Sequence, residues 1–501
     1  MTYNNYNTFL EKRESKMKKI RLFPLLLLVC LALTVFAPAA SALEAPQLTA
    51  KAVVLADLAS GRVLYSSNMD EQRAPASLTK IMTSLLVIEA VERGEHSMDE
   101  TVTAGDDCLT GLDEQSSNAG IVAGEQMSLQ NFLYCALISS ANEACNVLAS
   151  YIAGSIDGFV ELMNRRAAEL GCANTQFADP NGLSGENRTT AYDLYLITSE
   201  AIKHPDFMTI CNATSYTVPA TNVNKERIIN NSNALISASS VYGAGYIYQY
   251  AAGVKTGYTS AAGYCLISTA AKDGVSLLAV VLGCDGWLNA GIEEYKNFED
   301  TIALYNWAFD NYSYKTVLTA DDPIQKVSVQ LAQDDGTVIL RPQSDVTLLL
   351  PSDLDSSSVT TTATVYEDRL VAPIKAGTVL GEATFSIDGV EYGKVSLVNN
   401  ADVELSRGEY FKLKLKAIFS NGLVMMAIVV VLLLVVGYIA LVARYRRMRK
   451  EQLRRQRLAE QRRRKAQEQE RADAAGRAPP QDAAPGASGQ GEDFDWENMW
   501  K

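Results

Sequence analysis

Apolar residues change their spacing shortly after position 70. Residues 51–68 hold two short apolar runs that meet at Ser60–Gly61, which predicts a β-hairpin. Over residues 76–91 the apolar residues instead recur at intervals of three and four, which predicts a helix. The apolar positions of that helix are Leu78, Ile81, Met82, Leu85, Leu86 and Ile88.

Helical spacing continues downstream. Residues 128–154 contain two apolar helical runs, and a polar stretch at Ser139–Asn142 separates them. Residues 156–171 predict an amphipathic helix that stops at Gly171. A further helix is expected to open at Thr189 or Thr190, with Asp193 in its first turn.

The spacing becomes that of strands from Gly253 onward. Three short strands are predicted between Gly253 and residue 283, followed by a helix over 293–312. After about Tyr314, short apolar runs alternate with turn residues, which predicts a small all-β domain over 315–415.

Two longer apolar segments frame these elements. Near the N-terminus, basic residues precede an apolar run, Leu22–Phe36, and small residues follow at Ala40–Ala42. This layout is typical of a secretory signal peptide, here residues 1–42, with Met17 as an alternative start. An uncleaved anchor is the other interpretation.

The second apolar segment, residues 422–443, is uncharged and has the length of a membrane span. Residues 444–467 are strongly basic, so by the positive-inside rule they stay in the cytoplasm and the residues before Gly422 lie outside. The rest of the tail, up to residue 501, has too little apolar surface to fold alone. A buried globular helix is the alternative. The flanking charges favour the span, so we expect a single-pass cell-membrane protein whose residues before Gly422 form an extracellular domain.

Composition narrows the function classes. The formal net charge of −13 gives no basic footprint for nucleic acid, so no nucleic-acid partner is expected. The chain has eight cysteines but no C-x-x-C pair, which fits neither a disulfide framework nor a cysteine zinc site. Cys135, Cys145 and Cys265 lie in apolar runs and are expected in the core.

The sequence does not support a catalytic serine activated by histidine, as in a Ser-His-Asp triad. The two histidines, His96 and His204, lie in stretches typical of surface loops, and no G-x-S-x-G motif occurs. A catalytic serine in this chain therefore needs a base other than histidine.

Ser77 and Lys80 are candidates for a nucleophile and its base. Residues at i and i+3 share one face of a helix, and the start of a helix favours a developing negative charge. A lysine acts as a base only if burial or nearby positive charge lowers its pKa, so the pair predicts a second cation close by. The motif alone is weak, because Ser15 and Lys18 share it, and a helix start with a surface lysine is the simpler interpretation.

Two further motifs supply the missing groups. Lys255 and Thr256 begin a predicted strand, where a charge and a hydroxyl suit a substrate carboxylate, although an exposed strand lysine would look the same. Gly257 allows close approach of ligand or backbone. Ser140 and Asn142 lie between two apolar helical runs. Buried polar groups are costly there, which favours a functional role for them. The alternative is that they are simply the polar residues of a loop.

Taken in order, these three motifs resemble those of the penicillin-recognising serine hydrolases. The chain is most similar to the low-molecular-mass penicillin-binding proteins that are D-alanyl-D-alanine carboxypeptidases. The matching stretches are "ASLTKIMT", "SSANEAC", "DPNGLSGENRTTAYDL", "GVKTGYTSAAGYCLISTA" and "APIKAGTVLGEATFSIDG". The resemblance implies an α/β (α+β) catalytic domain over 43–314, with a helix-flanked sheet and a helical lobe, and then a small β-sandwich.

The resemblance also implies roles. Ser77 would attack the bond between two D-alanines of a peptidoglycan stem peptide, and Lys80 would take its proton. Ser140 would relay a proton to the leaving amine, and Asn142 would bind the substrate backbone. Lys255 and Thr256 would hold the terminal carboxylate and Gly257 would also contact the substrate, while the N–H groups of Ser77 and Tyr258 form an oxyanion hole. β-Lactam antibiotics would acylate the same serine, and no metal or organic cofactor is implied.

Three alternatives use the same motifs. A β-lactamase would need a deacylating glutamate, for which Glu186 is the only candidate, and a transpeptidase would need an amine acceptor. A non-hydrolytic wall or β-lactam sensor would be acylated without turnover. Two departures from the family are visible: a full membrane span replaces the usual amphipathic helix, and Ala141 stands where glycine is frequent.

Overall fold

The structure is a computed structural model, and it describes residues 44–113 and 115–475. Two compact units divide the chain, and strands β11 and β15 cross their boundary. The first unit holds the residues up to 328 with 337–370 and 374–402, and the second holds 329–336, 371–373 and 403–475. The predicted signal peptide and the end of the tail lie outside the described residues.

A five-stranded antiparallel sheet is the centre of the first unit. The predicted hairpin is confirmed, and so are the three strands after it, each of which has nine or ten residues. In sheet order the strands are β2 (Val63–Ser67), β1 (Ala52–Asp57), β9 (Val275–Cys284), β8 (Gly263–Lys272) and β7 (Ala251–Thr259).

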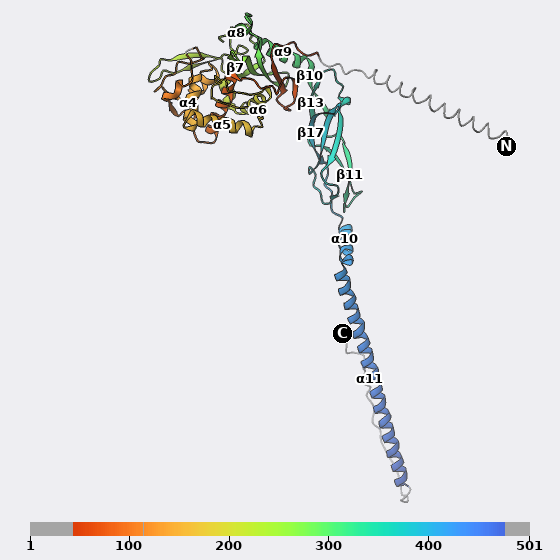
Figure 1. Cartoon of the computed structure of the whole chain (residues 1–501). Coiled ribbons are helices and arrows are strands. Elements are labelled where there is room, and N and C mark those ends of the chain that lie inside the picture. Colours follow the sequence, from red (N-terminus) through yellow and green to blue (C-terminus); the bar gives the residue numbers. More distant parts are fainter. Residues whose placement is uncertain (1–43, 114, 476–501) are drawn as a thin grey trace, which may run out of the picture. The chain divides into compact units, whose positions relative to one another are not determined.

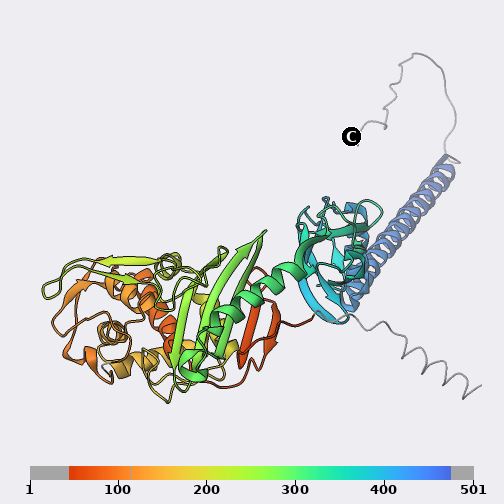
Figure 2. The same cartoon turned by 90° about the horizontal axis from the view of Figure 1, so that it is seen from above.

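Both faces of this sheet are buried. Successive strand residues point to opposite faces, so Val54 and Ala56 of β1 pack into one apolar core, and Val53 and Leu55 pack into another. The second core is closed by α9 (Lys296–Asn311), which lies along the sheet (Figure 2). Because both faces are covered, the strands read as continuous apolar runs rather than as an alternating pattern.

A helical lobe covers the first face. Within this lobe, ten of the thirteen residues of α2 (Lys80–Glu92) are buried, because other helices pack around most of its circumference. The other helices of the lobe are α3 (Leu129–Leu137), α4 (Asn142–Ala153), α5 (Ile156–Glu169), α6 (Ala191–Ala201) and α7 (Pro205–Cys211).

Short elements complete this part of the chain. They are the 3₁₀ turns η1 (Ala76–Thr79) and η2 (Asp106–Leu109), the paired strands β3 (Thr101–Thr103) with β4 (Gln126–Ser128) and β5 (Ser215–Val218) with β6 (Arg227–Asn230), and α8 (Trp287–Ala290).

Helix ends follow the predicted signals, with one exception. Gly171 follows α5 with a φ of +83°, and Thr190 caps α6 by accepting a hydrogen bond from the Asp193 amide at 3.0 Å. The exception is the helix predicted over 76–91, because its first four residues form the 3₁₀ turn η1 and the α-helix begins only at Lys80.

The predicted all-β domain is present as two sheets, but its predicted range of 315–415 was too long, because residues 407–415 belong to the helix α10. In the smaller, β10 (Tyr312–Leu318) pairs with β13 (Val346–Pro351), and a short 3₁₀ turn, η3 (Ser356–Ser358), follows β13. The larger sheet has the order β14 (Thr360–Val365), β16 (Val379–Ile387), β17 (Val390–Asn399), β12 (Thr337–Pro342), β11 (Gln325–Gln330) and β15 (Leu370–Val371).

The second unit is mainly helical. It contains α10 (Arg407–Ser420) and α11 (Gly422–Ala475), which are labelled in Figure 1. By length and composition, α11 is the one helix among the described residues that is apolar enough to cross a membrane. The uncharged part of α11 is the segment in which the sequence predicts a span.

The cysteines outside the predicted signal peptide are all buried and unpaired, and the burial expected for Cys135, Cys145 and Cys265 is confirmed. They are Cys108, Cys135, Cys145, Cys172, Cys211, Cys265 and Cys284. Both histidines lie in loops, as expected, but each is only partly exposed and contacts a carboxylate: Nδ1 of His96 lies 2.8 Å from Glu100, and Nδ1 of His204 lies 2.9 Å from Glu92.

Thr190 offers a direct test of the α6 start. Thr190→Ala removes the side chain that accepts the hydrogen bond of the Asp193 amide at a buried helix end. We expect the free energy of unfolding to fall by about 1 kcal/mol. Denaturant unfolding of the full-length chain in detergent measures the change, and Thr190→Ser serves as the control that keeps the cap. Equal stability of the alanine variant and the wild type would contradict this cap.

Candidate active site

Ser77 lies in the tight turn η1, directly before α2. The preceding residue, Ala76, has a φ of +50°, which an alanine adopts only when its surroundings require it. The main chain on either side of this turn packs so closely against it that glycine is needed at two positions, Gly182 and Gly257. A Cβ at Gly182 would overlap the carbonyl of Ala76, and one at Gly257 would lie 3.2 Å from the carbonyl oxygen of Pro75. The turn is therefore clamped between a loop and strand β7.

Lys80 extends beneath Ser77 and is completely buried. Its Nζ atom lies 2.9 Å from Oγ of Ser77, 2.7 Å from Oδ1 of Asn142 and 2.6 Å from the main-chain oxygen of Asn181. The last two atoms can only accept hydrogen bonds, so they hold two of the amine's protons. The third tetrahedral position of the amine points at the serine oxygen.

A second lysine lies near the Ser77–Lys80 pair, as that pair predicts. Lys255 is buried on β7, and its Nζ donates a 3.2 Å hydrogen bond to the Thr256 carbonyl. Burial, together with the charge of Lys80, holds the pKa of Lys255 well below its usual value of 10.5. Burial likewise lowers the pKa of Lys80, against the opposing influence of Cys145, Asp179 and Glu143.

A pocket of about 450 Å³ opens above the two lysines. It gathers six of the residues that the sequence singles out, namely Ser77, Ser140, Asn142, Thr256, Gly257 and Tyr258. Lys80 and Lys255 lie buried in the protein rather than on the pocket wall. The three motifs therefore converge, although about 180 residues separate the first from the last.

Ser140 and Asn142 lie where α3 gives way to α4. Ser140 has a φ of +64°, and Asn142 is the first residue of α4. The predicted break between two helices is confirmed, and it delivers both side chains to the pocket. Asn142 also has a contact that the sequence did not suggest, because its side-chain oxygen accepts from Lys80.

Three contributors to the site were missed from the sequence. Asn181 supplies the carbonyl that accepts from Lys80, and its loop is organised by Asp179, which accepts from the amides of Gly182 and Ser184. Ser232 lies 2.6 Å from the Thr256 hydroxyl and lines the same pocket. The turn-forming "DPNG" stretch was a visible signal for this loop, whereas a lone serine such as Ser232 gives none.

The β-lactamase alternative loses its candidate residue. Glu186 is exposed and does not line the pocket. Glu143, which follows Asn142 in the chain, is buried and accepts hydrogen bonds from the amides of Ala119 and Ile121. Burial raises the pKa of Glu143. These two hydrogen bonds indicate that Glu143 fastens a neighbouring loop.

Comparison with known proteins gives a consistent result. A family model described as D-alanyl-D-alanine carboxypeptidase matches residues 39–286, and one described as penicillin-binding protein 5, C-terminal domain, matches residues 312–405. The chain is 32% identical to D-alanyl-D-alanine carboxypeptidase DacF of Bacillus subtilis, over 72% of this chain and 90% of the relative. It is 31% identical to DacC of Escherichia coli, over 74% and 90%.

Solved structures agree with the sequence comparison. Penicillin-binding protein 5 from Haemophilus influenzae superposes with a TM-score of 0.58 and 28% identity, covering 72% of this chain and 99% of that one. Penicillin-binding protein 3 from Streptococcus pneumoniae gives a TM-score of 0.59 at 25% identity, covering 72% and 100%. The predicted fold class is thus confirmed. The chain belongs to the D-alanyl-D-alanine carboxypeptidases, a family of penicillin-binding serine hydrolases.

Proposed function

We propose that this carboxypeptidase works through an acyl-enzyme on Ser77, with Lys80 as the base. The observation that carries the proposal is the lysine amine held 2.9 Å from the serine oxygen by two acceptors. A neutral amine in this position directs its lone pair at the serine hydroxyl. Asn142 thus positions the base as well as lining the pocket.

Substrate binding supplies the charge that the mechanism needs. The terminal carboxylate of a D-Ala-D-Ala stem peptide binds at Thr256 beside Lys255, and Ser232 orients the Thr256 hydroxyl. Approach of this carboxylate favours the protonated form of Lys255. A protonated Lys255 in turn favours the neutral form of Lys80, because two buried like charges repel.

The reaction then proceeds in two steps. Ser77 attacks the carbonyl between the two D-alanines as Lys80 takes its proton, and Ser140 passes a proton to the leaving amine. The N–H groups of Ser77 and Tyr258 hold the oxyanion, each contributing about 3–4 kcal/mol. Water hydrolyses the ester and releases the shortened stem peptide. A β-lactam acylates Ser77 in the same way.

We also propose that α11 spans the cell membrane once, with the catalytic domain outside and the tail in the cytoplasm. The support is the order of its residues, because the apolar segment 422–443 is followed at once by the basic residues 444–467. With this anchor, the enzyme stays at the surface where stem peptides are exposed.

D-Alanine release from a pentapeptide ending in D-Ala-D-Ala tests the reaction. The full-length chain in detergent should release D-alanine, and Ser77→Ala should release none. Lys80→Arg keeps the charge but cannot lose its proton, so we expect a loss of at least about 100-fold. Lys51→Arg, at an exposed lysine, is the matched control. Stable acylation of the wild type by penicillin without D-alanine release would instead indicate a sensor.

The pH profile tests the base. Only neutral Lys80 can accept the proton, so kcat/KM should rise about tenfold per pH unit up to the pKa of Lys80 and then level off. The rising part of the pH profile should level off below pH 10.5, because burial lowers the pKa of Lys80 from that value. Lys255→Gln removes the neighbouring charge and should move the rising part to higher pH. An unchanged rising part in Lys255→Gln would contradict the coupling of the two lysines.

Protease accessibility tests the orientation. Trypsin added to intact spheroplasts should leave the basic tail after residue 444 uncut, and it should cut that tail once detergent opens the membrane. An antibody to the last residues of the chain detects the loss. Cleavage of the tail in closed spheroplasts would place it on the outer side and contradict the proposed orientation.

A further inference from the structure

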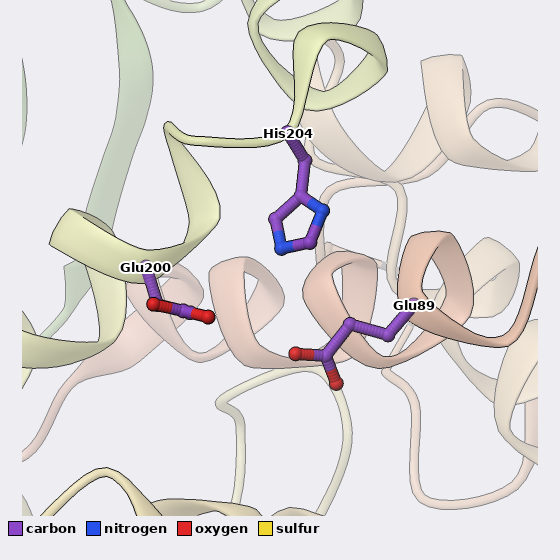
Figure 3. Close-up of side chains that lie close together, drawn as sticks. All are labelled: Glu89, Glu200 and His204. Atoms are coloured by element: carbon purple, nitrogen blue, oxygen red, sulfur yellow. The ribbon is translucent and has the colours of Figure 1, made fainter. Parts of the chain in front are cut away.

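Three side chains of the types that can bind metal ions lie close together outside the Ser77 pocket. Glu89 belongs to α2, Glu200 to the last turn of α6, and His204 directly precedes α7 (Figure 3). One possible ligand atom from each of the three lies within 4.8 Å of the others. Their side chains are mostly buried, with exposures of 13%, 25% and 13%.

His204 is oriented as a metal ligand would be. Its Nδ1 donates to the carboxylate of Glu92, with both oxygens at 2.9 Å, so the lone pair of the neutral ring lies on Nε2. Nε2 is buried and has no hydrogen-bond partner among the described residues. The ring edge that carries it faces Glu89 and Glu200 (Figure 3). A carboxylate behind the imidazole is the usual support of a metal-bound histidine.

Helix dipoles make the same place favourable for a cation. Both α2 and α6 end here, and neither has a basic residue in its last turn. The helices instead place Glu89, Glu92 and Glu200 near their negative ends, where carboxylates are unfavourable without a compensating positive charge.

The protein cations at this place compensate only part of that charge. Arg166 donates to Glu89 at 2.6 Å and contacts Glu200 and Glu169 at 3.3 and 3.4 Å. Lys203 pairs with Glu200 at 2.7 Å, although its side chain is 69% exposed. Two cations thus face the four carboxylates of Glu89, Glu92, Glu169 and Glu200.

Two more arginines lie close by. Arg93 is engaged by Glu95 at 2.8 Å, and Arg165 is exposed on the wall of an adjoining pocket that Glu89 and Arg166 also line. Together Arg93, Arg165, Arg166 and Lys203 bring four positive charges to the five carboxylates here, so the neighbourhood keeps an excess of one negative charge.

We propose that Glu89, Glu200 and His204 bind a divalent transition ion, Zn²⁺ or Mn²⁺. One imidazole nitrogen with two carboxylates is a donor set for these ions, whereas Mg²⁺ and Ca²⁺ prefer oxygen alone. Ligand atoms around such an ion lie closer together than 4.8 Å, because each bond is only about 2.0–2.2 Å. The side chains therefore draw in on binding.

Arg166 need not leave the cluster when the ion binds. Both of its bonds to Glu89 fall on Oε1, so Oε2 is available to the ion, and the weaker 3.3 Å contact to Glu200 is the one given up. The ion would join α2, whose first residue is Lys80, to α6 and to the start of α7. Its role is structural, and the Ser77 reaction does not pass through it.

Zinc titration of the full-length chain in detergent, purified without a histidine tag, tests the site. Calorimetry should detect one Zn²⁺ per chain, and a 100-fold excess over Kd should raise the unfolding temperature by roughly 5 °C. His204→Gln and Glu89→Gln should abolish both effects, and Glu92→Gln should weaken binding about 10- to 100-fold. His96→Gln changes the chain's other histidine, which also contacts a carboxylate, and should bind as the wild type does.

Cobalt binding provides a spectroscopic signal of metal coordination, which a change in protein stability cannot produce. Co²⁺ should produce visible absorption bands in the wild type and in His96→Gln, and displacement by Zn²⁺ should remove them. Unchanged labelling of Ser77 by a fluorescent penicillin shows that each variant is folded. The site is refuted if the wild type binds no zinc, or if folded His204→Gln binds it as tightly as the wild type.

Discussion

The contact between the Lys80 amine and the Ser77 hydroxyl is the constraint on which the site depends. A buried lysine is stable only if its protons are accepted, and here Asn142 and the Asn181 carbonyl accept two of them. These acceptors come from the start of α4 and from the loop organised by Asp179. The helical lobe and the loop are thus both needed to aim one nitrogen at one oxygen.

Two lysines buried near one another are costly, and the fold keeps them together through rigid supports. Lys255 lies on β7, which pairs with β8 on both sides of a bulge at Gly253 and Val254, in a sheet covered on both faces. Lys80 begins α2, most of which is buried. Neither side chain can leave without opening packed structure. The unfavourable charge therefore appears as lowered pKa values, and a lysine with a lowered pKa can serve as a base at neutral pH.

Some predictions failed for identifiable reasons. The helix expected over 76–91 starts late because β7 and the loop at Gly182 force the turn at Ala76, and such contacts leave no trace in local spacing. His204 reads as a surface residue in sequence, yet α2 packs against it and brings Glu89 and Glu92 to its two sides. Asn181 contributes only a main-chain carbonyl, which any residue type could supply.

The sequence by itself determined the first hairpin, the main helices of the lobe, the three long strands, the all-β domain, the apolar segment of α11 and the three motifs that the fold brings to one pocket. These follow from local spacing and residue type, which the chain displays directly. Only the tertiary structure decided that Lys80 and Lys255 share a low-dielectric interior, that Asn142 accepts a hydrogen bond from Lys80 and that Ser232 contacts the Thr256 hydroxyl. Burial and through-space charge depend on segments far apart in sequence, and only folding brings them together.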